Sequence, residues 1–418
     1  MRRMAIIGGT PLNGRVAISG SKNTALPILA ATILLHGDIT LKNIPFLNDV
    51  ITMIRVLRSL GIRAEYFEPN TVRIVVDDTV KHVAPYELVT KMRATFFIIG
   101  PILARNGMAK VPLPGGCAIG SRPVNIHLKG LEQLGAEIRV EHGVVIAHAK
   151  QLRGARIYLD FPSVGATETL IMAASLAEGT TIIENAAKEP EIGDLGSFLN
   201  QAGAKISGAG METVVIEGVP NLHGVNYSVI PDRIEAGTFM IAAALTKGDV
   251  TIAPIIPSHI EAIVQKLRES GVHVDLGSDQ VRVSTNGVVR SIDAKTMPFP
   301  GFPTDMQPQL IALMTKAAGT SIITETIFEH RTMHINELRR MGANIRIEDR
   351  SAVITGVPRL SGAPVRASDL RAGAALVVAG LAADGETLVE DMERQIDRGY
   401  EKFCEKLCGI GARVTVVD

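Results

Sequence analysis

Two alternating series of glycines constrain the fold of this chain more than any other feature of its sequence. The first series ends a Leu-x-x-x-Gly signal that follows a helix-like segment and precedes a segment of alternating apolar and polar residues. Glycine suits the C′ position of a helix because the left-handed conformation carries no Cβ penalty there, and alternation indicates a strand. The signal ends at Gly61, Gly135, Gly203, Gly271, Gly342 and Gly411, at intervals of 74, 68, 68, 71 and 69 residues.

The second glycine series closes runs of small and apolar residues. Its members are Gly37, Gly107, Gly179, Gly248, Gly319 and Gly385. The runs before them span residues 23–36, 94–106, 166–178, 234–247, 306–318 and 370–384. Their apolar positions are not confined to one stripe, and a helix that is apolar nearly all round is buried. After most of these glycines the sequence predicts another strand.

The two series together predict six copies of one unit of roughly 70 residues. Each unit holds a buried helix, a strand, an exposed amphipathic helix and further strands, so the fold class is α/β with helices inside and sheets outside. A single core stops growing near ~250–300 residues, and this chain has 418. A split into three plus three units is therefore expected, near Pro231, where the fourth buried helix begins.

The N-terminal strand predicted over residues 15–19 precedes the first buried helix, as residues 227–230 precede the fourth. The sixth unit ends at Asp418 without such a successor, so the N-terminal strand could complete the C-terminal domain. The predicted domains are residues 22–231, and residues 1–21 together with 232–418. The chain would cross between them twice, near Ser21 and Asp232, and two crossings make a natural hinge.

Composition excludes several classes of protein. Lys plus Arg and Asp plus Glu both number 43, whereas nucleic-acid binders usually carry a basic excess. The three cysteines, Cys117, Cys404 and Cys408, fit a reducing compartment better than a disulfide framework. The N-terminal apolar run is too short for a signal peptide, and no run reaches membrane-spanning length. We expect a soluble cytoplasmic protein that binds neither nucleic acid nor membrane.

One segment, Pro114–Pro123, combines a cysteine with three glycines and an arginine. Glycine and proline both oppose a helix, so the segment is predicted to be a mobile surface loop, where functional residues collect. A cysteine near a fixed cation can hold a lowered pKa, so Cys117 beside Arg122 could act as nucleophile or proton donor. The alternative is a turn with an incidental cysteine.

Polar residues gather at the N-terminal ends of the predicted buried helices. A helix N-terminus attracts anions, and three such ends from each domain around one cleft would make that cleft cationic. Phosphate or carboxylate ligands would suit it. For any single residue, N-capping or a local salt bridge explains the pattern as well. These polar residues are Lys22–Asn23, Lys91–Arg93, Ser163–Gly165, Asp232–Glu235, Thr304–Asp305 and Asp369–Arg371.

Other signals are discounted. Residues 8–14 are glycine-rich but precede a strand pattern, which is the wrong context for a dinucleotide site. His330 and His334 have the i,i+4 spacing of metal ligands, yet only Glu337 offers a third ligand, and a weak one, so we expect neither metal nor cofactor. Cys404 and Cys408 share that spacing, and core packing is the favoured role. His127 is either a ligand contact or a helix-start residue.

Several motifs in one order resemble the UDP-N-acetylglucosamine 1-carboxyvinyltransferase family of enolpyruvyl transferases. The resemblance runs from about residue 10 to the C-terminus. That family's fold, two inside-out α/β barrel domains of three units each with the active site in the interdomain cleft, agrees with the repeat count. The motifs are Ser19–Asn23, Pro114–Cys117, Ser163–Thr167, Pro231–Glu235, Phe302–Gln307, Asp369–Arg371 and Ile396–Glu401.

The resemblance implies transfer of the enolpyruvyl group of phosphoenolpyruvate to the 3′-hydroxyl of UDP-N-acetylglucosamine, with release of phosphate through a tetrahedral intermediate. This is the first committed step of peptidoglycan precursor synthesis, which links the protein to cell wall biogenesis, cell shape, the cell cycle and cell division. Cys117 matches the family's catalytic cysteine, which protonates the methylene carbon, forms a pyruvate adduct and is alkylated by fosfomycin. Asp305 matches the candidate general base.

The resemblance also implies the binding residues. Lys22, Arg122 and Arg398 match the cations that hold phosphoenolpyruvate and stabilise the departing phosphate. Arg331 and Arg371 are expected to line the same cleft. The residues that match acceptor contacts are Asn23, Arg93, Arg122, Pro123, Val124, Asn125, Ile126, Phe161, Pro162, Ser163, Val164, Asp305 and Ile327.

Five positions depart from the family pattern and leave acceptor detail open: Asn125, Phe161, His330, Thr332 and Gln395. One alternative is therefore the same reaction on another nucleotide acceptor. A second is transfer to 3-phosphoshikimate, although the shikimate enzyme lacks the Cys117 loop. A third is a catalytically silent nucleotide-sugar sensor, against which the intact Cys117, Asp305 and Arg398 count.

Overall fold

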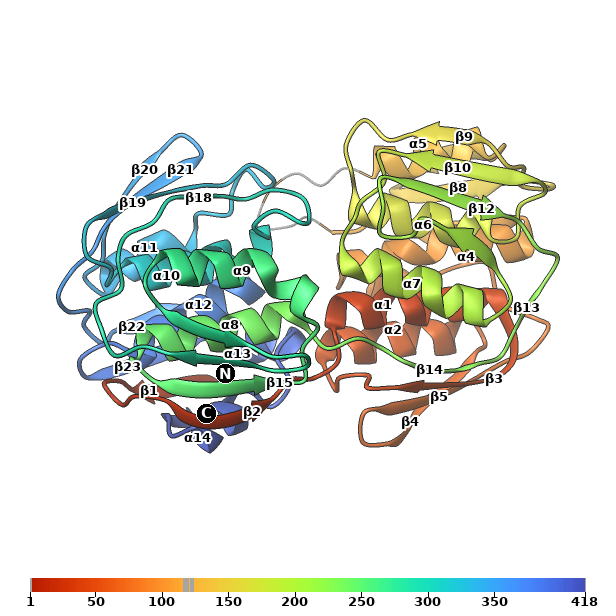
Figure 1. Cartoon of the computed structure of the whole chain (residues 1–418). Coiled ribbons are helices and arrows are strands. Elements are labelled where there is room, and N and C mark those ends of the chain that lie inside the picture. The colour runs from red at the N-terminus through yellow and green to blue at the C-terminus, as the bar shows by residue number, and fades with distance from the viewer. Residues whose placement is uncertain (1, 116–119, 121–123, 418) are drawn as a thin grey trace. The chain divides into compact units, whose positions relative to one another are not determined.

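The computed structural model describes residues 2–115, 120 and 124–417, which divide into two compact units (Figure 1). The N-terminal unit comprises the described residues of 20–115 and 124–230. The C-terminal unit comprises the described residues 2–19, 120 and 231–417. Both units mix helices with strands, as the predicted α/β class requires.

Three helices form the core of the N-terminal unit. They are rich in Ala, Leu and Ile, and most of their residues are buried, apart from the last turn of α4. Helices with one polar face pack around them. The buried helices are α1 (Lys22–Ala31), α4 (Ile99–Asn106) and α6 (Val164–Ala174), and the surrounding helices are α2 (Asn48–Ser59), α3 (Tyr86–Val89), α5 (Asn125–Gln133) and α7 (Pro190–Gln201), with 3-10 turns η1 (Thr32–Leu34) and η2 (Arg93–Ile98).

Strands of the N-terminal unit form three sheets, whose inward side chains join the helical core. The orders are β13-β3-β5-β4 with β14 also on β3, β6-β8-β7, and β11-β12-β10-β9. The strands are β3 (Leu35–Lys42), β4 (Arg63–Glu68), β5 (Thr71–Val76), β6 (Met108–Pro112), β7 (Glu137–Glu141), β8 (Val144–His148), β9 (Arg156–Tyr158), β10 (Thr180–Glu184), β11 (Lys205–Ser207), β12 (Thr213–Glu217), β13 (Leu222–His223) and β14 (Asn226–Ser228).

The C-terminal unit repeats this plan, with three mutually packed buried helices at its centre. These are α8 (Arg233–Leu245), α10 (Gln307–Met314) and α12 (Leu370–Leu381). Its other helices are α9 (Pro257–Glu269), α11 (His334–Arg340), α13 (Met392–Gln395) and α14 (Phe403–Gly409), with 3-10 turns η3 (Thr304–Met306) and η4 (Ile396–Arg398).

Three four-stranded sheets accompany these helices, in the orders β16-β17-β15-β2, β18-β19-β21-β20 and β22-β23-β1-β24. The strands are β1 (Arg3–Ile7), β2 (Asn13–Ala17), β15 (Asp249–Ala253), β16 (His273–Leu276), β17 (Val281–Ser284), β18 (Ala294–Lys295), β19 (Thr320–Thr324), β20 (Asn344–Glu348), β21 (Ser351–Thr355), β22 (Pro364–Arg366), β23 (Glu386–Glu390) and β24 (Arg413–Val417).

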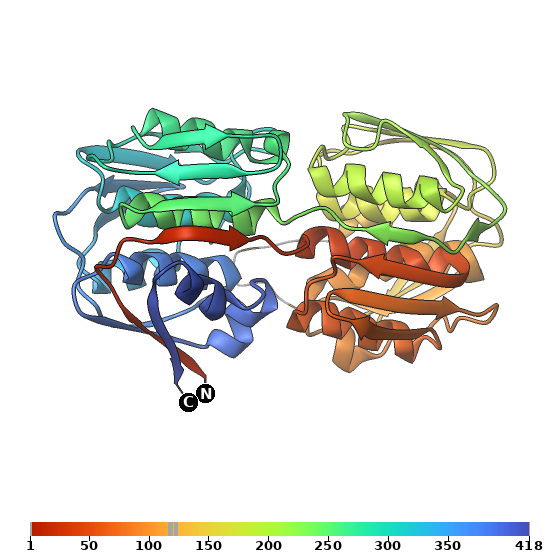
Figure 2. The same ribbon diagram turned by 60° about the horizontal axis from the view of Figure 1, so that its bottom comes forward.

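Each unit is completed by a strand that precedes a buried helix of the other unit. Strand β2, which leads to α1, pairs in parallel with β15, from Asn13 opposite Asp249 to Ala17 opposite Ala253. Strand β14, which leads to α8, pairs in parallel with β3. Strand β1 was not predicted; it lies between β23 and β24, so the two ends of the chain are neighbours (Figure 2).

The glycine signals have the backbone conformation that their sequence context predicted. All six glycines of the first series have φ between 87° and 102°. In the second series five glycines have positive φ, between 67° and 109°, and the exception is Gly248, because Lys247 takes the left-handed conformation instead, with φ 55°. A Cβ on Gly248 would lie 2.1 Å from the carbonyl oxygen of Leu12. Glycine is needed there for close backbone approach.

Two helix predictions need correction. The runs starting near residues 94 and 306 open as 3-10 turns, η2 and η3, before α4 and α10 begin. Helix α7 was predicted as an exposed amphipathic helix, but most of its residues are buried because it packs against both α1 and α6. Among the described residues, no helix is both long and apolar enough to cross a bilayer.

Candidate functional site

The polar residues at four buried helix starts act as N-caps. Ser21 and Ser163 accept hydrogen bonds from backbone N–H groups of α1 and α6. Asp232 and Asp369 each accept two, from the first turns of α8 and α12. Caps of this type satisfy otherwise unpaired donors. For these four residues, the capping alternative is therefore what the structure shows.

Asp305 is the centre of the candidate site in the C-terminal unit. It lies in η3, at the start of α10, and its carboxylate is bound by two arginines. Arg331 Nη2 lies 2.9 Å from Oδ1, and Arg371 donates from Nε and Nη2 to Oδ2 at 3.2 and 3.0 Å. The arginine side chains are only 4% and 2% exposed, whereas that of Asp305 is 25% exposed. Both carboxylate oxygens are thus paired with arginines, which form a clamp, while the group stays within reach of solvent.

A buried carboxylate holds the Arg331 side of this clamp. Arg331 Nη1 donates to Thr304 Oγ1 at 2.8 Å, and Thr304 donates to Glu325 Oε2 at 2.9 Å. Glu325 Oε1 accepts from Thr296 Oγ1 and from the backbone N–H of Ile327. This chain of bonds ties the candidate acceptor contact Ile327 to Asp305. The sequence analysis missed Glu325, because no spacing signal links it to Thr304.

Electrostatics keep the clamp charged. Burial is the largest single influence on the pKa of Arg371 and lowers it, but Asp305, Tyr400 and Asp232 together raise it by more, and the net direction is upward. Arg371 therefore remains a cation throughout the working range of pH, and its charge favours the ionised form of Asp305. An ionised carboxylate can accept a proton from a hydroxyl group.

Arg398 lies in η4, two residues before the buried Tyr400, and is half-buried. Its neighbour Asp397 pairs with Arg2 at 3.4 Å. Asp305, Ile327, Arg331 and Arg371 are brought together by the contacts above, and Arg398 belongs to the same unit.

The candidate residues of the N-terminal unit lie at helix starts. Lys22 begins α1, is buried, and places Nζ 3.5 Å from Asp49 Oδ2. Arg93 begins η2, and Asn23 follows Lys22. Residues 124–126 form the start of α5, where Asn125 is exposed. Residues 161–164 lead into α6, and the side chain of Phe161 is exposed.

Three of the predicted site residues, Cys117, Arg122 and Pro123, lie outside the described residues. They belong to the segment between β6 and α5.

The histidines and remaining cysteines have other roles. His127 is buried, with Nδ1 3.0 Å from Thr169 Oγ1 and its ring edge-on to Phe96, so it is a core residue. Burial lowers the pKa of His334 to about 4, although the charge of Asp369 opposes it, while His330 is exposed. The described residues hold no cluster of three His, Cys, Asp or Glu suited to a metal. Cys404 packs against the core, but Cys408 is exposed, which corrects its predicted core role.

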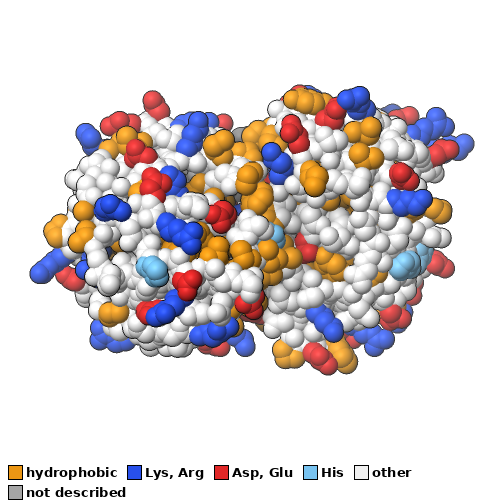
Figure 3. Space-filling model, in the orientation of Figure 1, with side chains coloured by type: hydrophobic (Ala, Val, Ile, Leu, Met, Phe, Trp, Pro, Cys, Tyr) orange, Lys and Arg blue, Asp and Glu red, His pale blue; other side chains and the backbone are white. Residues whose placement is uncertain are grey.

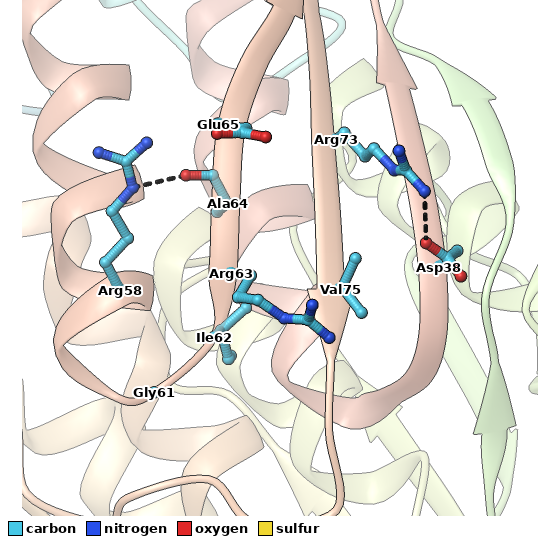
Figure 4. Close-up of a pocket in the computed structure, with 9 residues that line it drawn as sticks. All are labelled: Asp38, Arg58, Gly61, Ile62, Arg63, Ala64, Glu65, Arg73 and Val75. Carbon is cyan, nitrogen blue, oxygen red and sulfur yellow. Dashed lines mark hydrogen bonds and ion pairs between the residues drawn. The ribbon is translucent and has the colours of Figure 1, made fainter.

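A shallow pocket of about 750 Å³ lies over β4 and β5 and is separate from these residues (Figure 4). Three arginines line it, but Arg73 pairs with Asp38 and Arg58 donates to the carbonyl of Ala64. Charged side chains of both signs are interspersed over the face shown in Figure 3, in keeping with the zero net charge. Neither feature matches the candidate chemistry.

Comparison with known proteins assigns the family. A family model described as EPSP synthase (3-phosphoshikimate 1-carboxyvinyltransferase) matches residues 6–407. The UDP-N-acetylglucosamine 1-carboxyvinyltransferase of Gloeobacter violaceus is 54% identical over 98% of this chain and 90% of its own length. The chain belongs to the UDP-N-acetylglucosamine 1-carboxyvinyltransferase family. A relative of that family from Caldanaerobacter subterraneus is 55% identical over 97% of both chains.

Solved structures carry the same fold. The enolpyruvyl transferase NikO from Streptomyces tendae has a TM-score of 0.89 at 27% identity, covering 100% of this chain and 99% of its own. EPSP synthase from Acinetobacter baumannii has a TM-score of 0.78 at 18% identity over the whole of both chains, which shows the fold alone. The predicted family membership and enolpyruvyl transferase fold are thereby confirmed.

Proposed function

We infer that this protein transfers the enolpyruvyl group of phosphoenolpyruvate to the 3′-hydroxyl of UDP-N-acetylglucosamine and releases phosphate. The observation that carries this inference is identity above 50% over nearly the whole chain with several enzymes of that name. A second supports it: the described residues that match the family's chemistry, Lys22, Asp305 and Arg398, are all present. This assigns the chain to peptidoglycan precursor synthesis, in the cytoplasm, and through it to cell wall growth and cell division.

In the proposed reaction, Asp305 accepts the proton of the acceptor 3′-hydroxyl as its oxygen attacks C2 of phosphoenolpyruvate. Cys117 gives a proton to the methylene carbon, so a tetrahedral intermediate forms. Loss of a proton from the new methyl group and departure of phosphate then restore the double bond. Lys22, Arg122 and Arg398 neutralise the phosphate and carboxylate of phosphoenolpyruvate throughout. The same thiol is the proposed site of a pyruvate adduct and of alkylation by fosfomycin.

We further propose that residues 22–231, and residues 1–21 with 232–418, form two inside-out α/β barrel domains with the active site in the cleft between them. The repeat of three buried helices and three sheets in each unit supports this. Acceptor binding would close the cleft around the Cys117 segment. Small-angle scattering with and without UDP-N-acetylglucosamine tests closure, and an unchanged radius of gyration would contradict it.

The function is tested by phosphate release from phosphoenolpyruvate in the presence of different acceptors. Release only with UDP-N-acetylglucosamine is the expected result. Release with a different nucleotide sugar would favour the alternative acceptor, for which the exposed Asn125 and Phe161 are the natural specificity positions. Release with 3-phosphoshikimate alone would overturn the inference. The absence of release with every acceptor tested would overturn it as well.

A further inference from the structure

The clamp on Asp305 depends on a tyrosine that the proposed reaction does not use. The Arg371 guanidinium, which binds Asp305 Oδ2, lies with its central carbon 5.5 Å from the centre of the Tyr400 ring. A cation held over an aromatic face is attracted by the ring quadrupole, and the attraction strengthens when both groups are removed from water. Tyr400 is 1% exposed, and Arg371 is 2% exposed. The ring therefore fixes one face of the guanidinium.

The direction of each hydrogen bond at the Tyr400 hydroxyl follows from its neighbours. Thr238 donates its one hydroxyl proton to the carbonyl of Ile234 at 2.8 Å, so it can only accept from Tyr400, 3.0 Å away. Gln309 Nε2 donates to the Tyr400 oxygen at 3.1 Å and to Thr238 at 3.2 Å. The Tyr400 hydroxyl is thus held by two helices, through Thr238 and Gln309, while its ring contacts Arg371.

This arrangement keeps the phenol neutral. Burial raises the pKa of Tyr400, and although the charge of Arg371 lowers it, the net direction is upward. The proton thus stays on the phenol and is directed at Thr238. Each of the three central helices supplies one partner of Tyr400: Thr238 from α8, Gln309 from α10 and Arg371 from α12.

We propose that Tyr400 is a positioning residue for enolpyruvyl transfer, which aligns Arg371 and, through it, the Asp305 carboxylate. The proposal rests on the function inferred above, in which Asp305 receives the acceptor proton. It also accounts for the place of Tyr400 within Ile396–Glu401, the motif that carries Arg398. Displacement of a reacting group by about 1 Å can cost about 10²-fold in rate.

The test compares kcat for phosphate release in Tyr400→Phe, which keeps the ring and removes only the hydroxyl, with that of the unmodified chain. We expect kcat to fall about 10-fold, with a smaller change in KM for phosphoenolpyruvate. The ring loses its hydrogen bonds to Thr238 and Gln309, so it holds Arg371 and the Asp305 carboxylate less firmly, whereas the cations that bind phosphoenolpyruvate are untouched.

Helix α8 supplies a matched pair of controls. Thr238 and Thr246 both donate to the carbonyl four residues earlier at 2.8 Å, and both are buried, but only Thr238 contacts Tyr400. We expect Thr238→Val to lower kcat about threefold, because Tyr400 loses one of its two anchors. Thr246→Val should leave kcat unchanged at a similar loss of thermal stability. If Tyr400→Phe does not fold, this pair decides the question alone.

A double-mutant cycle separates positioning from general weakening of the fold. In an Asp305→Asn background, adding Tyr400→Phe should change single-turnover phosphate release less than twofold, because residues that act as one unit are non-additive. An unchanged kcat in Tyr400→Phe, or a full 10-fold additive loss in the double variant, would overturn the role of Tyr400 but not the inferred function. Absence of phosphate release from the unmodified chain with any acceptor would overturn the inferred function as well.

Discussion

The candidate residues of the two units differ in burial and in how closely they are ion-paired. In the C-terminal unit, Asp305 is held at 2.9–3.2 Å by two arginines that are almost fully buried. In the N-terminal unit, Lys22 lies 3.5 Å from Asp49, and candidates such as Asn125 and Phe161 are exposed. Charges fixed in a dry environment are preorganised and cost no reorganisation during reaction. We therefore expect the charged groups of the C-terminal unit to be preorganised before substrate binds. The candidate side chains of the N-terminal unit should become ordered only when they contact a ligand.

The largest expected effect is from Asp305→Asn, which removes the carboxylate that neutralises Arg331 and Arg371. Phosphate release should fall roughly 10³-fold, since an amide cannot accept the proton. The free energy of unfolding should fall by roughly 2–4 kcal/mol, because two buried cations lose their partner. Asp249→Asn is the control: its pair with Arg282 is exposed, so less than about 1 kcal/mol and no activity should be lost. Near-normal turnover in Asp305→Asn would refute the comparison.

Cys117→Ser probes the N-terminal contribution. A hydroxyl is a far weaker proton donor than a thiol, so turnover should fall by about 10²-fold or more, and fosfomycin should no longer inactivate the enzyme. Cys408→Ser, at an exposed free cysteine of the C-terminal unit, should keep both turnover and sensitivity. Turnover and mass spectrometry of the treated protein report the outcome. Full fosfomycin sensitivity in Cys117→Ser would show that the reactive thiol lies elsewhere.

A buried glutamate on each unit's core helices gives stability predictions of the same sign but different size. The pKa of Glu168 on α6 is raised by burial and then by the charges of Glu191 and Glu189. Burial raises the pKa of Glu235 on α8 to about 7, opposed by Lys406, whose Nζ lies 2.6 Å from its carboxylate. Both folded-state pKa values exceed the unfolded value, so the folded state binds these protons more tightly. The free energy of unfolding is therefore greatest below the pKa that each glutamate has in the unfolded chain. It falls as pH rises toward the pKa in the folded state.

At about pH 8, Glu168→Gln should stabilise the protein by roughly 1–3 kcal/mol, because the cost of a buried charge disappears. Glu235→Gln should stabilise it by less, because the ion pair with Lys406 offsets part of the cost of the buried charge. Both variants should show a flatter dependence of unfolding free energy on pH between about 5 and 8 than the unmodified chain. Urea unfolding at the two pH values measures this. A larger gain from Glu235→Gln than from Glu168→Gln at pH 8 would contradict the assignment of Lys406 to Glu235 alone.

The smallest expected effect concerns the one departure from the glycine pattern. Lys247 is exposed and has φ 55°, a conformation that costs a residue with a Cβ about 1–2 kcal/mol. Lys247→Gly should raise stability by about 0.5–1 kcal/mol, after the greater unfolded-state entropy of glycine is subtracted. Lys247→Ala keeps the Cβ and should give no gain. Thermal unfolding of the two variants distinguishes conformational relief from loss of the lysine side chain.

The sequence by itself determined the repeat, the buried helices and the helix-ending glycines. These features follow from local rules: glycine has no Cβ to oppose positive φ, and a helix apolar all round has no stable place except a core. It also supplied the motifs whose family membership the comparisons confirmed. Strand β1 escaped prediction because five residues, Arg3–Ile7, carry no periodicity that distinguishes a strand between two others from a short apolar run.

Tertiary structure alone decided which groups hold Asp305. Arg371 is 66 residues away along the chain and Tyr400 is 91 from Gln309, its hydrogen-bond partner. No spacing rule reaches across such separations; the three helices must first pack before their side chains share one buried layer. Buried polar groups are then forced to satisfy one another. That requirement selected Glu325, Thr304 and Tyr400 as the support of the candidate base, and it acts only once water has been excluded.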